Sequence, residues 1–317
     1  MVSKVRIGLI GAGEITRKHL DVIADIGWIE AVGITSRTKS KAEHVAQEYG
    51  IPVCSNDVES LIEEVRPDAL MVLVSVEQTY QVVTTLLPYK LPLFLEKPPG
   101  LIPDETKTLA ELAQAHSVQT MVGFNRRFYS VFRKGLDVIR DKGPLLGVSV
   151  DGHERFWKIK DSLSDTKRSN WIYANSTHTI DLLRFFGGEP SNIHAVAHNY
   201  IEKNGDQFAA TMDLDSGAIG RYNAHWYSPG GWGAILYGDG VTVEFKPLEN
   251  GTWTDKQFKT HEITPDEVDQ KYKPGFYEQM KAFGEMVVNG SLPWPGQDLA
   301  ASYKTMQLTE KISIGSP

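Results

Sequence analysis

The first residues that could do chemistry form a glycine-rich turn near the N-terminus. The turn reads Gly11-Ala12-Gly13-Glu14-Ile15-Thr16, follows the apolar run Val5–Ile10, and leads into a helical pattern. In such a turn Gly11 allows a sharp bend, and Gly13 lets backbone N–H groups approach a pyrophosphate at the start of the helix. The third glycine of the usual pattern is Thr16 here. Ordinary strand-to-helix loops can also be glycine-rich, but this context favours a dinucleotide site.

The end of the second apolar run discriminates between the two nicotinamide dinucleotides. An NAD site carries an acidic residue there, which accepts a hydrogen bond from the ribose 2′-hydroxyl. This chain has Ser36 and Arg37 at that point, with Lys39 and Lys41 close behind and no carboxylate. A hydroxyl and a guanidinium suit the 2′-phosphate of NADP. Arg37 could instead be a solvated loop residue, but the missing acid argues against NAD in either case. The sequence therefore predicts NADP, with NAD as the alternative.

Two opposite charges follow a later apolar run, Leu93–Leu95, which continues as Glu96-Lys97-Pro98-Pro99. A surface ion pair would be the commoner explanation of Glu96 and Lys97 taken alone. However, the carboxyl ends of buried parallel strands border the crevice in which open α/β sheets bind ligands. This position makes Lys97 a candidate for the active site.

The elements expected to position these residues fall into two domains. Over residues 1–123, short apolar runs alternate with amphipathic helical patterns, which predicts an α/β domain with a doubly wound parallel sheet of the Rossmann type. Residues 124–317 contain a helix that ends at Gly187-Gly188 and then five extended runs separated by turns such as Asp239-Gly240. Tight turns between consecutive strands predict an antiparallel meander. We therefore expect a C-terminal α+β domain, built on an open and mainly antiparallel sheet, for substrate binding and oligomerisation.

The predicted elements have the following limits. The strands are expected at residues 5–10, 31–35, 69–74, 93–95, 119–122, 145–155, 193–200, 207–214, 218–226, 232–236 and 241–245. The helices are expected at residues 15–26, 40–49, 58–63, 78–87, 103–115, 131–140, 177–186, 275–288 and 298–312. A sheet face left uncovered by helices is often where another subunit packs, so a homodimer or homotetramer through the C-terminal sheet is expected.

Composition limits the class of function. The 317 residues, 41% hydrophobic and 23% charged, are enough for two globular domains. A net charge of −7 gives no footprint for nucleic acid, and no cluster of Cys and His has metal-ligand spacing. The single cysteine, Cys54, suits a reducing compartment. No stretch approaches the roughly 18 apolar residues of a membrane span, and the start lacks the features of a signal peptide. We therefore expect a cytoplasmic protein with no metal, membrane or nucleic-acid partner.

Together, these motifs resemble those of the glucose-fructose oxidoreductase, inositol dehydrogenase and rhizopine-catabolism (Gfo/Idh/MocA) oxidoreductases, over nearly the whole chain. The resemblance rests on Gly11-Ala12-Gly13-Glu14-Ile15, Glu96-Lys97-Pro98, Val122-Gly123-Phe124-Asn125-Arg126-Arg127-Phe128, His178-Thr179-Ile180-Asp181-Leu182-Leu183 and Gly187-Gly188. The glycine-rich turn combined with Glu-Lys-Pro is far more specific than either motif alone. The resemblance implies an NAD(P)-dependent oxidoreductase acting on CH–OH groups of a sugar, cyclic polyol or nucleotide-linked sugar.

The resemblance also implies roles for individual residues. Lys97 polarises the carbonyl or stabilises the alkoxide, and His178 is the acid/base group. A helix start disfavours the charged imidazole of His178, and Asp181, one turn further on, can orient it. The expected cofactor-binding residues are Gly11, Gly13, Glu14, Ile15, Ser36, Arg37, Ser75, Glu96, Lys97, Asn125 and Arg126. The expected substrate-binding residues are Lys97, Arg155, Trp171, Asn175 and His178.

Two of these substrate-binding residues have open alternatives. Arg155 follows the strand expected to border the crevice, so it could contact an acidic or phosphorylated substrate, or it could be an ordinary surface residue. Trp171 could pack near the nicotinamide or simply fill the core.

Two departures from the family pattern affect the site. The family usually has an aspartate four residues before the histidine, where this chain has Ala174. Asn175 is the nearest polar residue, and it could equally serve the start of the helix. Where many members carry a proline and then a histidine after the third long apolar run, this chain has Ser75-Val76 and then Tyr80.

Alternatives to an NADP-dependent enzyme stay open. One is an NAD-dependent polyol or dihydrodiol-type dehydrogenase in which Thr35 and Ser36 serve the 2′-hydroxyl. Another is a non-catalytic dinucleotide sensor that regulates a partner. Ala174 is the only support for a sensor, whereas Lys97 and His178 argue against it. Because the aspartate is absent, either Lys97 or His178 could be the main acid/base group.

Overall fold

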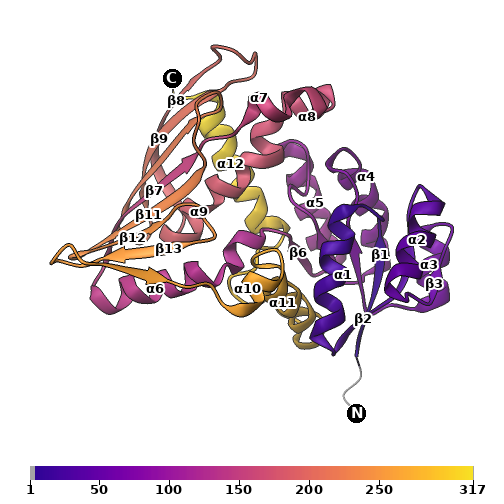
Figure 1. Cartoon of the computed structure of the whole chain (residues 1–317). Helices are drawn as coiled ribbons and strands as arrows, with labels where there is room; N and C mark the ends of the chain where they lie inside the picture. Colours follow the sequence, from indigo (N-terminus) through magenta and orange to yellow (C-terminus); the bar gives the residue numbers. More distant parts are fainter. Residues whose placement is uncertain (1–3, 317) are drawn as a thin grey trace. The chain divides into compact units, whose positions relative to one another are not determined.

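The computed structural model describes residues 4–316 of the chain (Figure 1). The chain divides into two compact units, and each is described by itself. The first comprises Met1–Asn125 and Lys271–Tyr303, and the second comprises Arg126–Gln270 and Lys304–Pro317. The sequence division at residue 123 lies close to the first change of unit. It differs from the structure further on, because residues 271–303 return to the first unit instead of staying in the second.

The first unit contains a six-stranded sheet in the order β3-β2-β1-β4-β5-β6, in which all neighbours are parallel. Its strands are β1 (Val5–Ile10), β2 (Ile29–Thr35), β3 (Val53–Cys54), β4 (Ala69–Val72), β5 (Leu93–Leu95) and β6 (Thr120–Val122). Its helices include α1 (Glu14–Ile26), α2 (Lys39–Tyr49), α3 (Val58–Val65), α4 (Val76–Leu86), α5 (Pro103–His116) and α11 (Phe276–Asn289). The strand order reverses between β1 and β4, as in a doubly wound sheet. The predicted Rossmann fold is confirmed.

Helix α11 joins the first unit although it lies far along the chain. Gly284 of α11 lets the helix approach closely, because a Cβ there would lie 2.5 Å from the ring of Trp28. Phe283 packs edge-on against Phe94 of β5, with 5.5 Å between ring centroids. The helical pattern of this segment was predicted correctly, but a pattern of apolar residues does not say which sheet the helix will cover.

The second unit contains an eight-stranded sheet in the order β14-β13-β12-β11-β7-β10-β9-β8. Its strands are β7 (Leu145–Gly152), β8 (Pro190–His198), β9 (Gln207–Leu214), β10 (Ile219–His225), β11 (Trp232–Gly238), β12 (Val241–Phe245), β13 (Gly251–Thr254) and β14 (Thr260–Ile263). The neighbours are antiparallel except for the parallel pair of β7 and β10. The prediction of a mainly antiparallel sheet is confirmed. The prediction of a simple meander is wrong, because β7 lies between the consecutive strands β10 and β11.

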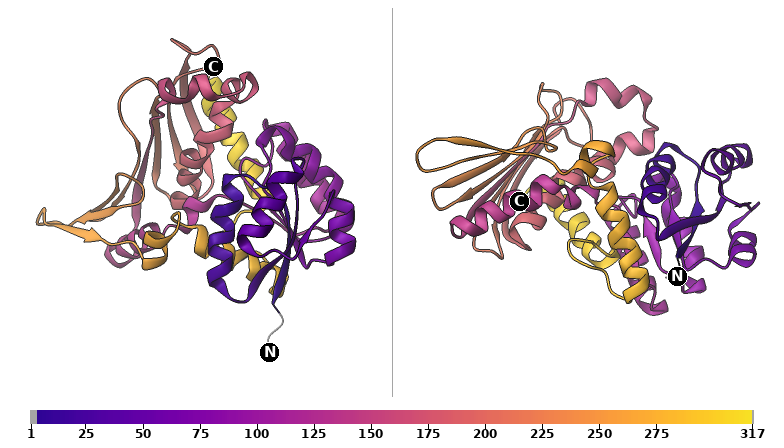
Figure 2. Two further views of the ribbon diagram at one scale, coloured as in Figure 1. Left: turned by 45° about the vertical axis from the view of Figure 1, so that its right-hand side comes forward. Right: turned by 60° about the horizontal axis from the view of Figure 1, so that its bottom comes forward.

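Helices α6 (Ser130–Lys142) and α9 (Thr177–Gly187) pack on one face of this sheet. The strands alternate accordingly: in β9, Phe208 and Met212 are buried while Ala209 and Thr211 are exposed. Figure 2 shows the opposite face of the described sheet without a covering helix. The remaining helical segments are α7 (Phe156–Ile159), α8 (Asp165–Ser169), a π-helical turn (Ile172–Ser176), α10 (Glu267–Lys271) and α12 (Leu299–Ile314). Over residues 4–316, no helix has both the length and the apolar character to cross a membrane.

Candidate functional site

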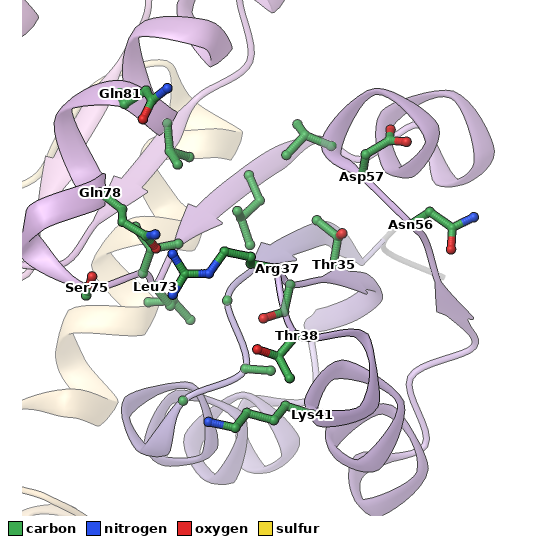
Figure 3. Close-up of a pocket in the computed structure, with 18 residues that line it drawn as sticks. Thr35, Arg37, Thr38, Lys41, Asn56, Asp57, Leu73, Ser75, Gln78 and Gln81 are labelled. Carbon is green, nitrogen blue, oxygen red and sulfur yellow. The ribbon is translucent and has the colours of Figure 1, made fainter.

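A cavity of about 480 Å³ lies at the carboxyl ends of β1, β2 and β4 (Figure 3). This is the point at which the strand order reverses, where open α/β sheets bind ligands. The structure brings five of the residues predicted from the sequence to its wall: Gly11, Gly13, Ser36, Arg37 and Ser75.

The glycine-rich turn leaves space at the start of α1. Gly11 has a φ of +115°, and a Cβ there would lie 2.3 Å from the backbone oxygen of Leu73, so only glycine fits. A Cβ on Gly13 would meet no atom within 4 Å. Gly13 has no side chain to cap the helix, and the Thr16 N–H donates to the Gly13 oxygen at 3.1 Å, which leaves the N–H groups of Glu14 and Ile15 to face a pyrophosphate. Thr16, which replaces the third glycine, is buried and donates its hydroxyl to the Gly11 oxygen at 3.1 Å.

Basic and hydroxyl groups gather at the end of β2. Figure 3 shows the Arg37 side chain extending along the cavity toward Gln78 of α4. Thr38 and Lys41 also line this wall. Lys39, by contrast, donates to Asn56 Oδ1 at 2.9 Å. The positive charges expected from the sequence are thus divided, with Arg37 and Lys41 on the cavity and Lys39 engaged elsewhere.

One carboxylate, Asp57, also lines this cavity. It stands at the start of α3, and its Oδ1 accepts the backbone N–H of Ser60 at 2.8 Å. This backbone hydrogen bond lowers the pKa of the Asp57 carboxyl. Asp57 is therefore a helix cap that lies after β3 in the sequence, and not the acidic residue of an NAD site at the end of β2.

Glu96 is half-buried and forms a hydrogen bond with a buried histidine. Its Oε1 lies 2.8 Å from Nε2 of His19 in α1, and the buried His19 ring stacks on Phe276 with centroids 4.6 Å apart. Burial acts to raise the pKa of the Glu96 carboxyl. The His19 hydrogen bond and charge, with the charges of Lys273 and Lys97, outweigh burial and leave the pKa below its usual value. Glu96 is therefore ionised beside Lys97, and it is not half of a simple surface pair.

A second cavity, of about 510 Å³, lies in the second unit beyond the end of β7. Its lining includes Glu154, Arg155, Trp232, Lys246 and Glu249. Two further predicted residues contact the Trp232 ring. The Arg126 guanidinium carbon lies 4.4 Å from the ring centroid, and the His178 ring centroid lies 6.0 Å from it. The structure thus brings Arg126 and His178 against one indole, and Arg155 lines the cavity that this indole borders.

Asn175 also reaches this second cavity, through Glu154. Its amide donates to Glu154 Oε2 at 2.9 Å, and the Ser176 hydroxyl donates to Oε1 at 2.8 Å. Both donors belong to the π-helical turn that leads into α9, and such turns are frequent at functional sites. Asn175 therefore holds a carboxylate, which is a different use from the helix-start role considered from the sequence.

Asp181 and Trp171 lie in other surroundings. Asp181 accepts two hydrogen bonds from Arg127, at 2.6 and 3.0 Å, and one from Thr305 at 2.8 Å. Burial acts to raise the pKa of Asp181, but the Arg127 charge and these hydrogen bonds lower it overall. Trp171 packs against Phe156, 5.8 Å between centroids, and lines a third cavity. The orienting role of Asp181 stays a prediction, and Trp171 lies in an aromatic cluster.

Two family models match this chain, one in its N-terminal part and one in its C-terminal part. A model of the oxidoreductase family with an NAD-binding Rossmann fold matches residues 5–124, and a model of the Gfo/Idh/MocA C-terminal domain matches residues 148–244. The chain belongs to the Gfo/Idh/MocA oxidoreductase family. It is an NAD(P)-dependent oxidoreductase with a nicotinamide dinucleotide cofactor, as predicted.

Similar proteins in this family use either nicotinamide cofactor. The scyllo-inositol 2-dehydrogenase (NAD(+)) of Bacillus subtilis is 24% identical over 318 residues, which cover 92% of this chain and 89% of that protein. The D-xylose 1-dehydrogenase (NADP(+)) 2 of Haloferax volcanii is 22% identical and covers 90% of both chains. The structure of a UDP-N-acetylglucosamine 3-dehydrogenase from Acidithiobacillus ferrooxidans has a TM-score of 0.80 at 18% identity, covering 99% of this chain and 98% of that one. This last likeness shows the fold alone.

This Gfo/Idh/MocA oxidoreductase contains two buried titratable residues that sequence reasoning missed, His19 and Glu154. His19 lies on the same buried stripe of α1 as Thr16 and Ile23, so its helical spacing was the available signal. Glu154 directly precedes Arg155, which drew attention by its charge, and nothing local indicates that Glu154 is buried. Within residues 4–316, no group of three or more acidic, His or Cys side chains is arranged to hold a metal ion.

Proposed function

We propose that this family member is an NADP-dependent oxidoreductase that transfers a hydride between the nicotinamide and a CH–OH carbon of a sugar, cyclic polyol or nucleotide-linked sugar. The observation that carries the choice of cofactor is the end of β2, where Ser36 and Arg37 line the cavity. A guanidinium and a hydroxyl bind a phosphate, whereas a 2′-hydroxyl would call for a carboxylate at this place. The alternative is NAD, with Thr35 and Ser36 serving the 2′-hydroxyl.

The pyrophosphate of the cofactor would be held by the turn from Gly11 to Gly13 and by the first residues of α1, Glu14 and Ile15. The space beside Gly13 and the uncapped start of α1 support this assignment. Ser75 lines the same cavity and is proposed as a further contact. Glu96, Asn125 and Arg126 do not line this cavity, and the family resemblance is what supports them as further cofactor contacts. When bound, the nicotinamide accepts or returns the hydride.

Lys97 and His178 are proposed to handle the proton and the charge on oxygen. In oxidation, His178 takes the hydroxyl proton while Lys97 stabilises the negative charge that develops on the oxygen. In reduction, Lys97 polarises the carbonyl and His178 returns the proton. The prediction that a helix start favours a neutral His178 does not hold in the structure, because the π-helical turn Ile172–Ser176 runs directly into α9 and His178 lies inside a continuous helical segment. Asp181, fixed by Arg127, would set the orientation of α9 and hence of His178.

The cavity beside Trp232 is proposed to bind the substrate. It combines an indole face with carboxylate, guanidinium and ammonium groups from Glu154, Arg155, Lys246 and Glu249. An aromatic ring with surrounding polar groups suits the apolar face and the hydroxyls of a carbohydrate. The inositol and xylose dehydrogenases among the relatives support this class of substrate.

The test is a steady-state assay of the purified protein with inositols, pentoses, hexoses and UDP-sugars, each with NADP and with NAD, followed by absorbance of the reduced nicotinamide. We expect turnover with NADP at a higher kcat/KM than with NAD. The Lys97→Ala variant should lose turnover but still quench tryptophan fluorescence on binding NADPH. A preference for NAD would contradict the choice of cofactor, and a normal rate in Lys97→Ala would remove Lys97 from the chemistry.

We also propose a homodimer or homotetramer through the uncovered face of the eight-stranded sheet. Ile219 of β10 and Tyr237 of β11 flank Gly147 of β7 on this face, and Val196 of β8 is exposed as well. Such exposed apolar side chains are typical of a surface that a second subunit covers. Light scattering after size exclusion should give a multiple of the chain mass, and Ile219→Asp should reduce it. A monomeric wild type would refute this proposal.

A further inference from the structure

The feature that the proposed chemistry leaves unexplained is the buried carboxylate of Glu154. Glu154 follows β7 and is 5% exposed, although it borders the cavity beside Trp232. Its two oxygens accept hydrogen bonds from the neutral side chains of Asn175 and Ser176, at 2.9 and 2.8 Å. Glu249, another carboxylate on the same cavity, is exposed to solvent.

Burying a carboxylate costs free energy even when it is hydrogen-bonded, because it loses its hydration. A glutamine of the same shape could occupy this place without a charge. A buried acid at the wall of a cavity is therefore more typical of a functional group than of a stabilising one. The exposed Glu249 carries no such cost, so the comparison singles out Glu154.

The two donors connect Glu154 to the acid/base histidine. Asn175 and Ser176 lie in the π-helical turn, and His178 follows two residues later at the start of α9. This turn also contains Ala174, the position at which the family pattern has its aspartate. The turn thus lacks a carboxylate at position 174, while the segment after β7 presents the Glu154 carboxylate to Asn175 and Ser176 of the same turn.

We propose that Glu154 supplies the carboxylate that acts on His178, in place of the aspartate missing at position 174. This inference rests on the proposed function, in which His178 moves the proton. Glu154 is a positioning residue in this scheme: its charge favours the protonated imidazole, and its bonds to Asn175 and Ser176 fix the turn before His178.

Other charges face the same region, so the effect of Glu154 must be separated from theirs. The charged and titratable groups on the surrounding elements are Asp151, His153 and Arg155 from β7 and its extension, Lys246 and Glu249 from the end of β12, Arg126 over Trp232, and Asp181 with Arg127 and Arg184 in and beside α9. Asp151 is paired with Lys246 at 3.5 Å, and Asp181 is paired with Arg127. Glu154 is the one among these acids that is bound to the turn preceding His178.

The variant for the test is Glu154→Gln, with Glu244→Gln as the control, because Glu244 of β12 is exposed and does not line this cavity. The glutamine keeps the shape of Glu154, and the Ser176 hydroxyl can rotate and the Asn175 amide can turn over to pair with it. We expect Glu154→Gln to lower kcat by about 10- to 100-fold with an unchanged KM for NADPH. Its pH–rate limb should move to lower pH by about 0.5–1.5 units, because the variant removes a negative charge that favours the protonated imidazole. Glu244→Gln should change neither quantity.

Two outcomes would overturn the inference. One is a Glu154→Gln variant whose kcat stays within threefold of wild type and whose pH–rate limb does not move. The other is a loss of rate without any movement of the pH–rate limb. A second measurement keeps the test independent of turnover. NMR titration of the His178 imidazole should give a lower midpoint in Glu154→Gln than in the wild type. If the wild type turns over no CH–OH substrate, the proposed function fails, while equal His178 midpoints would refute the role of Glu154 separately.

Discussion

Replacing Arg37 with alanine tests how the protein chooses its cofactor. Arg37 lines the dinucleotide cavity and extends toward Gln78, but its side chain is exposed to solvent. A charge-assisted hydrogen bond contributes about 1.5–3 kcal/mol when it is shielded from water. Because solvent screens an exposed pair, we expect a loss of about 1–2 kcal/mol for NADPH, which corresponds to a roughly 5- to 30-fold weaker Kd. NADH, which lacks the 2′-phosphate, should bind the variant as it binds the wild type.

The assay is titration of tryptophan fluorescence with NADPH and NADH at two salt concentrations. The Debye length is about 30 Å at 0.01 M and about 8 Å at 0.15 M salt, so the loss in Arg37→Ala should be larger at low salt. The matched control is Lys39→Ala, because Lys39 stands nearby but is held by Asn56. It should leave the NADPH affinity within a factor of two or three, as expected for a surface charge.

Two outcomes would refute this reasoning about Arg37. Equal weakening of NADPH and NADH would mean that Arg37 serves a part common to both cofactors. An unchanged Kd for NADPH would mean that the 2′-phosphate does not meet the guanidinium, and the NAD alternative with Thr35 and Ser36 would gain support.

Three further predictions each concern one unit. Gly11→Ala should abolish NADPH binding in fluorescence titration, because the new Cβ would lie 2.3 Å from the Leu73 oxygen. Asp181→Asn should lower the free energy of unfolding in urea by about 3–5 kcal/mol, because it leaves the buried Arg127 without its charged partner. The lowered pKa of Glu96 means that its ionised form adds stability above its ordinary value of 4.5, and that this contribution disappears as the pH falls through the lower folded value. Acid unfolding should therefore depend less steeply on pH in Glu96→Gln than in the wild type.

Gly11→Ala and Asp181→Asn each have a control variant, and all three predictions have a contrary outcome. Gly13→Ala, whose Cβ meets open space, should leave the urea midpoint unchanged, and tight NADPH binding by Gly11→Ala would contradict the steric argument. Asp213→Asn, on the uncovered sheet face, should cost little, and a fully stable Asp181→Asn would show that the pair with Arg127 adds no stability. Identical acid profiles for wild type and Glu96→Gln would show that ionised Glu96 does not stabilise the fold.

Strands with continuous apolar runs were predictable from the sequence. β1 and β5 lie where their runs predicted, because such runs are typical of strands buried on both faces. β3 was missed because it is two residues long and only half-buried. β13 and β14 were missed because their residues are mostly threonine and charged or aromatic types that also suit a loop.

The order of the strands and the place of α11 depend on contacts between distant residues. The parallel pairing of β7 with β10 joins residues about seventy positions apart, for example Val148 with Gly220. Turn residues such as Asp239-Gly240 specify only the hairpin that contains them. A local pattern therefore predicts each element but not its neighbour in the sheet.

The candidate site likewise contains some residues that a local pattern predicts and others that only the fold brings together. The turn at Gly11 and Gly13 and the pair Ser36-Arg37 could be read locally, because the chemistry of a dinucleotide site is concentrated in short segments. Glu96 was noticed, but its partner His19 is 77 positions away. Glu154 and Asn175 are 21 positions apart, and neither predicts the other. Partners of this kind become visible only when the fold brings the segments together.

The return of α11 to the first unit has a consequence for how the chain is made. A nascent chain leaves the ribosome N-terminus first, at about 5–20 residues per second. All six strands of the first sheet emerge roughly 150 residues before α11, so this half waits about 8–30 s for its last helix. During that interval Trp28, Phe94 and His19 lack the cover that Gly284, Phe283 and Phe276 later provide. The nucleotide-binding half is thus begun first and completed almost last, and a chain truncated before α11 would present these aromatic surfaces to chaperones.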